Sequence, residues 1–240
     1  MRQPSLQIGR CLTLCSEDKR IRLRESVLKW YQANGRHFPW RQTSDPLHIL
    51  LAECLLRQTQ ATRLRKPYLE LTSRYSSADI LAKANVDELR DWFRPLGLVK
   101  RADRLVQAAR ILVESFAGQV PRNLEALASL PGVGIYSARA ILCLGFGEPY
   151  PMVDEGSGRV LRRVLGMAPL GPAYCDSRLL QVAAVMLPEA SPKEFNLGLI
   201  DIASAYCHAT APACSHCPLT GICLHGEQNV NVWREPTDGD

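Results

Sequence analysis

Four cysteines near the C-terminus have the spacing of metal ligands. Cys207, Cys214, Cys217 and Cys223 form the pattern C-x6-C-x2-C-x5-C. Four thiolates this close in sequence can bind a tetrahedral zinc ion or an iron–sulfur cluster. Zinc sites more often combine two C-x2-C pairs, and this stretch contains a single such pair. The nearby histidines are interpreted as surface residues. The spacing therefore favours an iron–sulfur cluster and leaves zinc as the alternative.

Two carboxylates occupy positions that need an explanation. Glu53 interrupts the apolar run LHILLAECLL, where a charge is costly unless it is paired or functional. A buried salt bridge and a functional role explain it equally well. Asp154 stands at the start of the helical run that follows PMV. Its simplest role is that of a helix N-cap.

A glycine turn precedes Asp154 by about twenty residues. LPGVG carries Gly132 and Gly134 between two predicted helices, LEALASL and IYSARAILCLGFG. The first N–H groups of the second helix have no intrahelical partner, and glycine allows another backbone to come close. Such a turn can bind an anion, and a nucleic-acid phosphate is a natural occupant. A plain helix–helix turn is the alternative interpretation.

Composition sets broad limits on the class of protein. The chain has 240 residues and a formal charge of +5, and its pI is about 8.8, which permits nucleic-acid binding without proving it. No apolar run is long enough for a membrane span, and the N-terminus lacks the apolar core of a secretory signal. Nine cysteines, five of them scattered, indicate a reducing compartment with one metal or cluster site rather than a disulfide framework.

Periodicity predicts an all-α protein with short connections. Helical spacing predicts a helix over 21–34 and a buried helix that begins at Pro46. It also predicts two short helices capped by Ser77 and Asn85, and a basic helix before Gly118. Two more helices are predicted in 177–190 and 192–207. Residues 1–20 have no clear period and are predicted to be a flexible lead-in, and the polar tail after Cys223 is predicted to be disordered.

Taken together, these motifs resemble a known family. The order LPGVG-x-Y-x-A-x-A-I, then the aspartate, then the cysteine pattern is similar to the helix-hairpin-helix base-excision DNA glycosylases of the endonuclease III superfamily. The resemblance covers roughly residues 22–224. FPWR, AECLLRQTQ and FNLGLIDIASAYC are further matches. They indicate the branch that contains the adenine glycosylase MutY and the archaeal thymine mismatch glycosylase Mig.

The resemblance implies two helical domains flanking a DNA-binding cleft. A six-helix barrel with the hairpin is expected at 43–148. An iron–sulfur cluster domain is expected from 21–42 and 149–224, with 225–240 as a tail. The target base is expected to flip out of duplex DNA, as an enzyme must arrange to reach a stacked base. The protein is expected to be a monomer in the cytoplasm, associated with the nucleoid if bacterial or archaeal, without membrane contact.

The resemblance also implies catalytic roles. Asp154 matches the aspartate that stabilises positive charge on the sugar and activates water. Glu53 matches the glutamate that protonates the leaving base in the adenine enzymes. Tyr136 stands where the bifunctional lyases carry a lysine nucleophile, and a phenol cannot form a Schiff base. A monofunctional enzyme with little or no lyase activity is therefore expected.

The remaining implied site residues contact DNA or hold the cofactor. The hairpin amides are expected to bind a phosphate. Gln58 is expected to fill space beside the partner of the flipped-out base, and Leu98 is expected to wedge into the duplex. The four cysteines are expected to hold a 4Fe-4S cluster. The DNA-binding residues implied are Gly132, Gly134, Gln58, Leu98, Lys100 and Arg101.

Three substrate interpretations follow, beside a non-catalytic one. Thymine or uracil opposite guanine is favoured by Tyr136 and by the chain ending soon after the cysteines. Adenine opposite guanine or 8-oxoguanine is favoured by Glu53 and RQTQ, and a modified base is a third possibility. A cluster-containing DNA-binding or redox-sensing protein without catalysis is the fourth. The presence of both carboxylates argues against that last interpretation.

Overall fold

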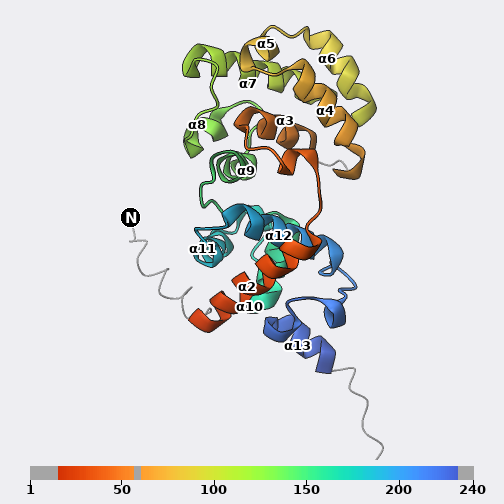
Figure 1. Cartoon of the computed structure of the whole chain (residues 1–240), viewed down its shortest axis with the longest axis vertical. Coiled ribbons are helices and arrows are strands. Elements are labelled where there is room, and N and C mark those ends of the chain that lie inside the picture. The colour runs from red at the N-terminus through yellow and green to blue at the C-terminus, as the bar shows by residue number, and fades with distance from the viewer. Residues whose placement is uncertain (1–15, 57–60, 232–240) are drawn as a thin grey trace, which may run out of the picture. The chain divides into compact units, whose positions relative to one another are not determined.

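The computed structural model describes residues 16–56 and 61–231, and within these ranges every regular element is a helix (Figure 1). The all-α prediction is confirmed. None of the described helices is both long and apolar enough to cross a membrane. The α-helices are α2 (Glu17–Asn34), α3 (Pro46–Leu56), α4 (Arg65–Arg74), α5 (Ala78–Ala82), α6 (Val86–Phe93), α7 (Val99–Phe116), α8 (Leu124–Ser129), α9 (Ile135–Phe146), α10 (Glu155–Leu165), α11 (Ser177–Met186), α12 (Pro192–Ala205) and α13 (Leu224–Asn231). Short 3-10 turns lie at η1 (Pro39–Arg41), η2 (Ala61–Arg63), η3 (Arg94–Leu96), η4 (Ala173–Cys175), η5 (Cys214–His216) and η6 (Thr220–Ile222).

The chain folds into two compact units. The described residues up to Arg36 and those from Pro149 onward form one unit, and residues 37–148 form the other. Residues 37–42 were predicted with the cluster domain, and that prediction is wrong. Trp40 of η1 is buried and packs edge-on against Tyr68 of α4, with ring centroids 5.4 Å apart, so this turn belongs to the unit of α4.

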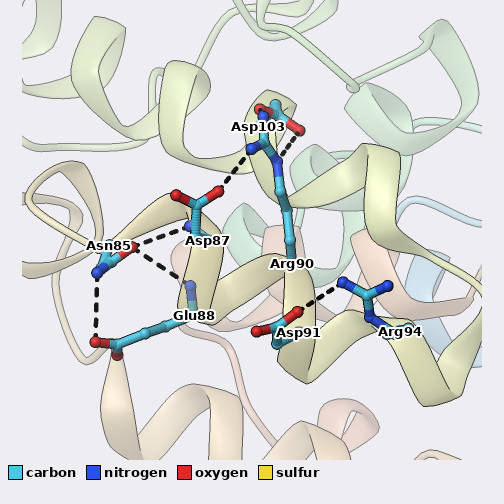
Figure 2. A network of polar contacts seen from close by, with 7 residues as sticks. All are labelled: Asn85, Asp87, Glu88, Arg90, Asp91, Arg94 and Asp103. Carbon is cyan, nitrogen blue, oxygen red and sulfur yellow. Dashed lines mark hydrogen bonds and ion pairs between the residues drawn. The ribbon is translucent and has the colours of Figure 1, made fainter.

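In the 37–148 unit, α3 is the buried helix that the sequence predicted. Most of its apolar residues are buried, and it packs against α9 where Pro46 lies close to Gly145. α5 and α6 lie against α7 (Figure 1). Arg90 reaches from α6 to Asp103 of α7 (Figure 2). The predicted caps are confirmed, since Ser77 caps α5 and Asn85 caps α6.

The other unit is organised around α10 and α12. α12 packs against α2 at Gly198, where a Cβ would lie 2.7 Å from the Cγ1 atom of Val27. α10 packs against α12 beside Gly156, where a Cβ would lie 3.1 Å from the Cβ of Ala203. A larger side chain at either glycine would push the helices apart. These contacts fix the start of α10, where Asp154 stands.

Helices occupy part of both terminal segments that were predicted to be irregular. Helix α2 begins at Glu17, because the hydroxyl of Ser16 accepts a hydrogen bond from the N–H of Lys19 and two acidic residues occupy the first turn. The prediction of a flexible lead-in over residues 1–20 is therefore wrong for residues 17–20. The tail prediction is wrong for 224–231, which form α13 against α10 and η6.

Candidate active site and cysteine cluster

Glu53 lies in a pocket of the 37–148 unit. The pocket has a volume of about 110 Å³, and it is lined by α3, by α7 and by the hairpin between α8 and α9. The lining residues are Leu50, Glu53, Cys54, Arg101, Arg104, Leu105, Pro131, Gly132, Val133 and Ser137. Three of the residues predicted from the sequence, Glu53, Arg101 and Gly132, are therefore brought together.

Glu53 is buried and hydrogen-bonded. Glu53 is only 9% exposed, and Ser137 is 2% exposed. The Oε2 atom of Glu53 accepts a 2.9 Å hydrogen bond from the hydroxyl of Ser137. The donor comes from α9, 84 positions away in the sequence. The contact explains how a carboxylate is tolerated in an apolar helix, because a hydroxyl partner offsets part of the desolvation cost. Sequence reasoning missed Ser137, which carries no motif signal of its own.

The predicted glycine turn connects α8 to α9. Gly132 has φ +84°, a left-handed conformation that favours glycine. Gly134 is the N-cap of α9, and no side chain caps that helix. The start of a helix carries partial positive charge, which favours an anionic partner there. Tyr136 is the second residue of α9 and is half-buried.

The other predicted DNA contacts differ in their surroundings. Lys100 is exposed on α7, whereas Arg101 is half-buried and donates from Nη1 to the carbonyl of Cys54. Leu98 is 6% exposed, so a wedge into DNA requires it to leave its present packing. Gln58 lies outside the described residues. Arg104 was not predicted, yet it is exposed and lies against the hairpin, its Cβ 3.3 Å from where a Cβ of Gly132 would be.

Asp154 stands in the other unit as the N-cap of α10. Its Oδ1 accepts the N–H of Ser157 at 2.6 Å and the hydroxyl of Ser157 at 2.8 Å, and the same hydroxyl accepts the N–H of Asp154 at 3.0 Å. Within the described part of the chain, Oδ2 has no hydrogen-bond partner. The N-cap interpretation is therefore right as far as it goes. The N-cap role occupies Oδ1 and leaves Oδ2, at the positive end of a helix, able to contact another group.

The four predicted ligand cysteines surround η5 and η6. Cys207 follows α12, Cys214 and Cys217 bracket η5, and Cys223 precedes α13. All four are half-buried free thiols. In the described ranges, no group of three or more His, Cys, Asp or Glu residues is arranged to hold a metal ion.

Arginines of α10 hold the first cysteine. Arg159 donates from Nε to the carbonyl of Cys207 at 2.7 Å, and Arg163 lies with Nη1 3.3 Å from the Sγ of Cys207. Arg163 also donates to the carbonyls of His208 and Ala209. The helix that begins at Asp154 therefore also fixes the entry to the cysteine loop. Sequence reasoning did not single out either arginine.

Burial sets the ionisation of the free thiols. It raises the pKa of Cys217 to about 11, with smaller opposing contributions from a backbone N–H and small raising ones from the neighbouring thiols. Burial likewise raises the pKa of Cys214 and of Cys223. Backbone N–H groups of Leu219, and of His225 and Gly226, face the sulfurs of Cys217 and Cys223 and act to lower their pKa. Amides directed at sulfur suit thiolate ligands of an iron–sulfur cluster, whose negative charge they stabilise.

Comparison with known proteins identifies the family. The sequence profile of the HhH-GPD superfamily base excision DNA repair proteins matches residues 51–180. The chain belongs to this family. It is 38% identical over 209 residues to a thymine-DNA glycosylase of Aeropyrum pernix, covering 85% of this chain and 93% of that protein. The predicted family resemblance is confirmed.

Further comparisons place this HhH-GPD protein among DNA glycosylases. A solved structure of a thermostable thymine-DNA glycosylase superposes with a TM-score of 0.83 at 33% identity, covering 88% of this chain and 98% of that one. An adenine DNA glycosylase of Mycobacterium tuberculosis is 34% identical over 197 residues, which cover 81% of this chain and 64% of that protein. The prediction of a base-excision DNA glycosylase is confirmed by these relatives, and the adenine enzymes are the more distant ones.

Proposed function

We propose that this HhH-GPD protein is a monofunctional glycosylase that releases thymine or uracil mispaired with guanine in duplex DNA. The observation that carries the proposal is the carboxylate of Asp154, whose Oδ1 is held by Ser157 while Oδ2 has no partner among the described residues. A fixed anion with one available oxygen is what hydrolysis of a glycosidic bond requires of a protein.

The reaction follows from these groups. The bond between C1′ and the base nitrogen breaks, and its electron pair leaves with the base, so positive charge develops on the sugar. Asp154 stabilises that charge, and its Oδ2 accepts a proton from the attacking water as the hydroxyl adds to C1′. The departing base takes up one proton from solvent, and Asp154 returns to solvent the proton it accepted, so that the net reaction consumes one water. The products are the free base and an abasic deoxyribose with a 1′-hydroxyl.

Tyr136 supports hydrolysis rather than strand cleavage. A lyase of this family needs an amine that attacks C1′ and forms an imine. Tyr136 has a phenol at that position, in the first turn of α9. Water is then the nucleophile, and the abasic strand remains intact.

The pyrimidine substrate is supported by similarity and by size. The thymine-DNA glycosylase relative aligns over almost its whole length, whereas the alignment covers 64% of the adenine enzyme. The pocket beside Glu53 has about 110 Å³. An apolar cavity of about 150 Å³ holds benzene, so this volume is on the scale of a single ring.

We further propose that Cys207, Cys214, Cys217 and Cys223 hold a 4Fe-4S cluster with a structural role. The thiols of Cys207, Cys214 and Cys223 each help to raise the pKa of Cys217, which places the four sulfurs near one another. When bound, the cluster would connect Cys207, the turn at η5 and Cys223, and Arg163 would offset its negative charge beside Cys207.

A panel of mismatched duplexes tests the substrate. The protein is incubated with duplexes carrying T·G, U·G, A·G or A·8-oxoguanine, and hot alkali then cleaves at abasic sites. Cleavage of the T·G and U·G duplexes is expected. Cleavage confined to the adenine-containing duplexes would support the second candidate, an adenine glycosylase. The buried carboxyl group of Glu53 favours that candidate, because a carboxyl group there can donate a proton to the leaving base.

Asp154→Asn tests catalysis itself. The substitution keeps the shape of the side chain and removes its charge, so base release is expected to fall at least about a hundredfold with DNA affinity retained. Near-normal turnover would leave Asp154 a helix cap and would overturn its catalytic role.

A further inference from the structure

A single buried side chain fixes the segment that leads to Asp154. Asn196 of α12 is 3% exposed. Its Oδ1 accepts the N–H of Met152 at 2.9 Å, and its Nδ2 donates to the carbonyl of Tyr150 at 3.0 Å. Residues 148–154 have no regular secondary structure, so this segment depends on such contacts for a defined path. The FNLGLID motif, which includes Asn196, thereby acquires a role that its sequence did not disclose.

Ser157 fixes the carboxylate at the end of that segment. The residue is 1% exposed, and its N–H and hydroxyl both approach Oδ1 of Asp154, at 2.6 and 2.8 Å. Because both donors converge on one oxygen, they restrain the two side-chain torsions of Asp154. The direction of Oδ2 is then determined by the geometry of the first turn of α10 rather than by rotation in solvent.

The neighbouring glycine keeps this arrangement uncrowded. A Cβ at Gly156 would lie 3.3 Å from Oδ1 of Asp154 and 3.1 Å from the Cβ of Ala203. Both distances are tighter than ordinary contacts. A glycine here lets α10 approach α12 without moving the carboxylate.

We propose that Ser157 and Asn196 are positioning residues for base release: Asn196 sets the backbone before Asp154, and Ser157 sets the rotation of its carboxylate. The inference rests on the proposed catalytic role of Asp154. A misplacement of a reacting group by about 1 Å can lower a rate about a hundredfold without changing binding. Neither residue touches the substrate in this mechanism.

The test measures rate and binding separately in the full-length protein. Single-turnover release of thymine from a T·G duplex is followed with enzyme in excess, and the dissociation constant of the same duplex is measured on ice. Ser157→Ala and Asn196→Asp are each expected to lower the rate about 10- to 100-fold and to change the dissociation constant less than about twofold.

Matched variants separate positioning from general loss of stability. Ser77→Ala removes the hydroxyl that caps α5 in the other unit and is expected to lower the melting temperature without lowering the rate. If Asn196→Asp does not fold, Ser157→Ala decides the result. Normal rates in folded Ser157→Ala, with Asp154→Asn inactive, would overturn the positioning roles alone. Normal rates in Asp154→Asn would instead overturn the proposed function.

Discussion

The hydroxyl of Ser137 donates a 2.9 Å hydrogen bond to Oε2 of Glu53, and both residues are at least nine-tenths buried. The bond joins the central helix α3 to the hairpin helix α9. Loss of this bond leaves a buried oxygen with one donor fewer, which costs more than the loss of an exposed bond. The pair therefore contributes to the stability of the 37–148 unit and to the shape of the pocket.

Ser137→Ala is expected to lower the free energy of unfolding by about 1–3 kcal/mol, because a buried oxygen of Glu53 loses a donor. Urea denaturation followed by circular dichroism measures the change. Ser129→Ala is the control, since that exposed hydroxyl bonds only to the carbonyl of Ala126 within its own helix. Equal stability of the two variants would mean that the Ser137–Glu53 bond contributes nothing.

Wild-type protein is expected to form no covalent adduct with DNA under borohydride. Tyr136 has no amine, so no imine is present to reduce. Tyr136→Lys is expected to gain a trapped adduct, because the hairpin already places the side chain in the first turn of α9. Denaturing gels measure both. A strong adduct with the wild type would require another amine and would remove the monofunctional assignment.

DNA affinity is expected to depend on salt through phosphate contacts, with Arg104 among them. This exposed cation lies against the hairpin turn and makes no ion pair within the described residues. Arg104→Ala should reduce the slope of log K against log salt by about 0.9. Arg110→Ala, two turns along α7 and outside the pocket lining, serves as the control of equal charge. Equal slopes for wild type and Arg104→Ala would exclude a phosphate contact there.

Anaerobically purified protein is expected to contain about four irons per chain and to absorb broadly near 400 nm, as thiolate-bound clusters do. Cys217→Ser is expected to lose both signals, because a serine hydroxyl replaces a thiolate ligand. Cys175→Ser is the control, since that cysteine is exposed and lies outside the four. Stoichiometric zinc without iron would contradict the cluster.

Sequence patterns predicted the elements better than the contacts between them. Apolar spacing located α3, and side-chain caps located the starts of α5 and α6, because both signals lie within a few residues of the feature that they predict. The glycine turn was equally local. The first turn of α2 was missed because Ser16 and two acidic residues carry the signal there, not apolar period.

Long-range polar pairs could not be predicted in this way. Asn196 bonds to Met152 from 44 positions away, and Ser137 reaches Glu53 from 84. Periodicity tells which face of a helix is buried but not which polar groups meet there. Ser157 was closer to prediction, since D-x-x-S before a helix is a variant of the capping box.

The buried pair of Asp176 and Arg162 gives a prediction with a defined pH dependence. Asp176 caps α11, and its Oδ2 lies 3.0 Å from Nη2 of Arg162. Burial alone would raise the pKa of Asp176, but the hydrogen bonds from Arg162 and from the N–H of Leu179, with the charges of Arg178 and Arg162, outweigh it and lower that pKa. A lowered pKa in the folded state means that ionised Asp176 stabilises the fold above the unfolded value of about 3.9. This stabilisation is lost as the pH falls through the lower, folded value.

Asp176→Asn is therefore expected to cost about 1.5–3 kcal/mol at pH 7, because Arg162 loses its charged partner while the cap to Leu179 can persist. The difference from wild type should stay constant down to about pH 5 and shrink below about pH 4. Urea denaturation at pH 7, 5 and 3 measures it. Asp91→Asn is the control, because its pair with Arg94 is exposed on both sides and should contribute less than about 0.5 kcal/mol at any pH. A gap that widens in acid would show that Asp176 is protonated more readily in the folded chain than in the unfolded one, contrary to its contacts with Arg162.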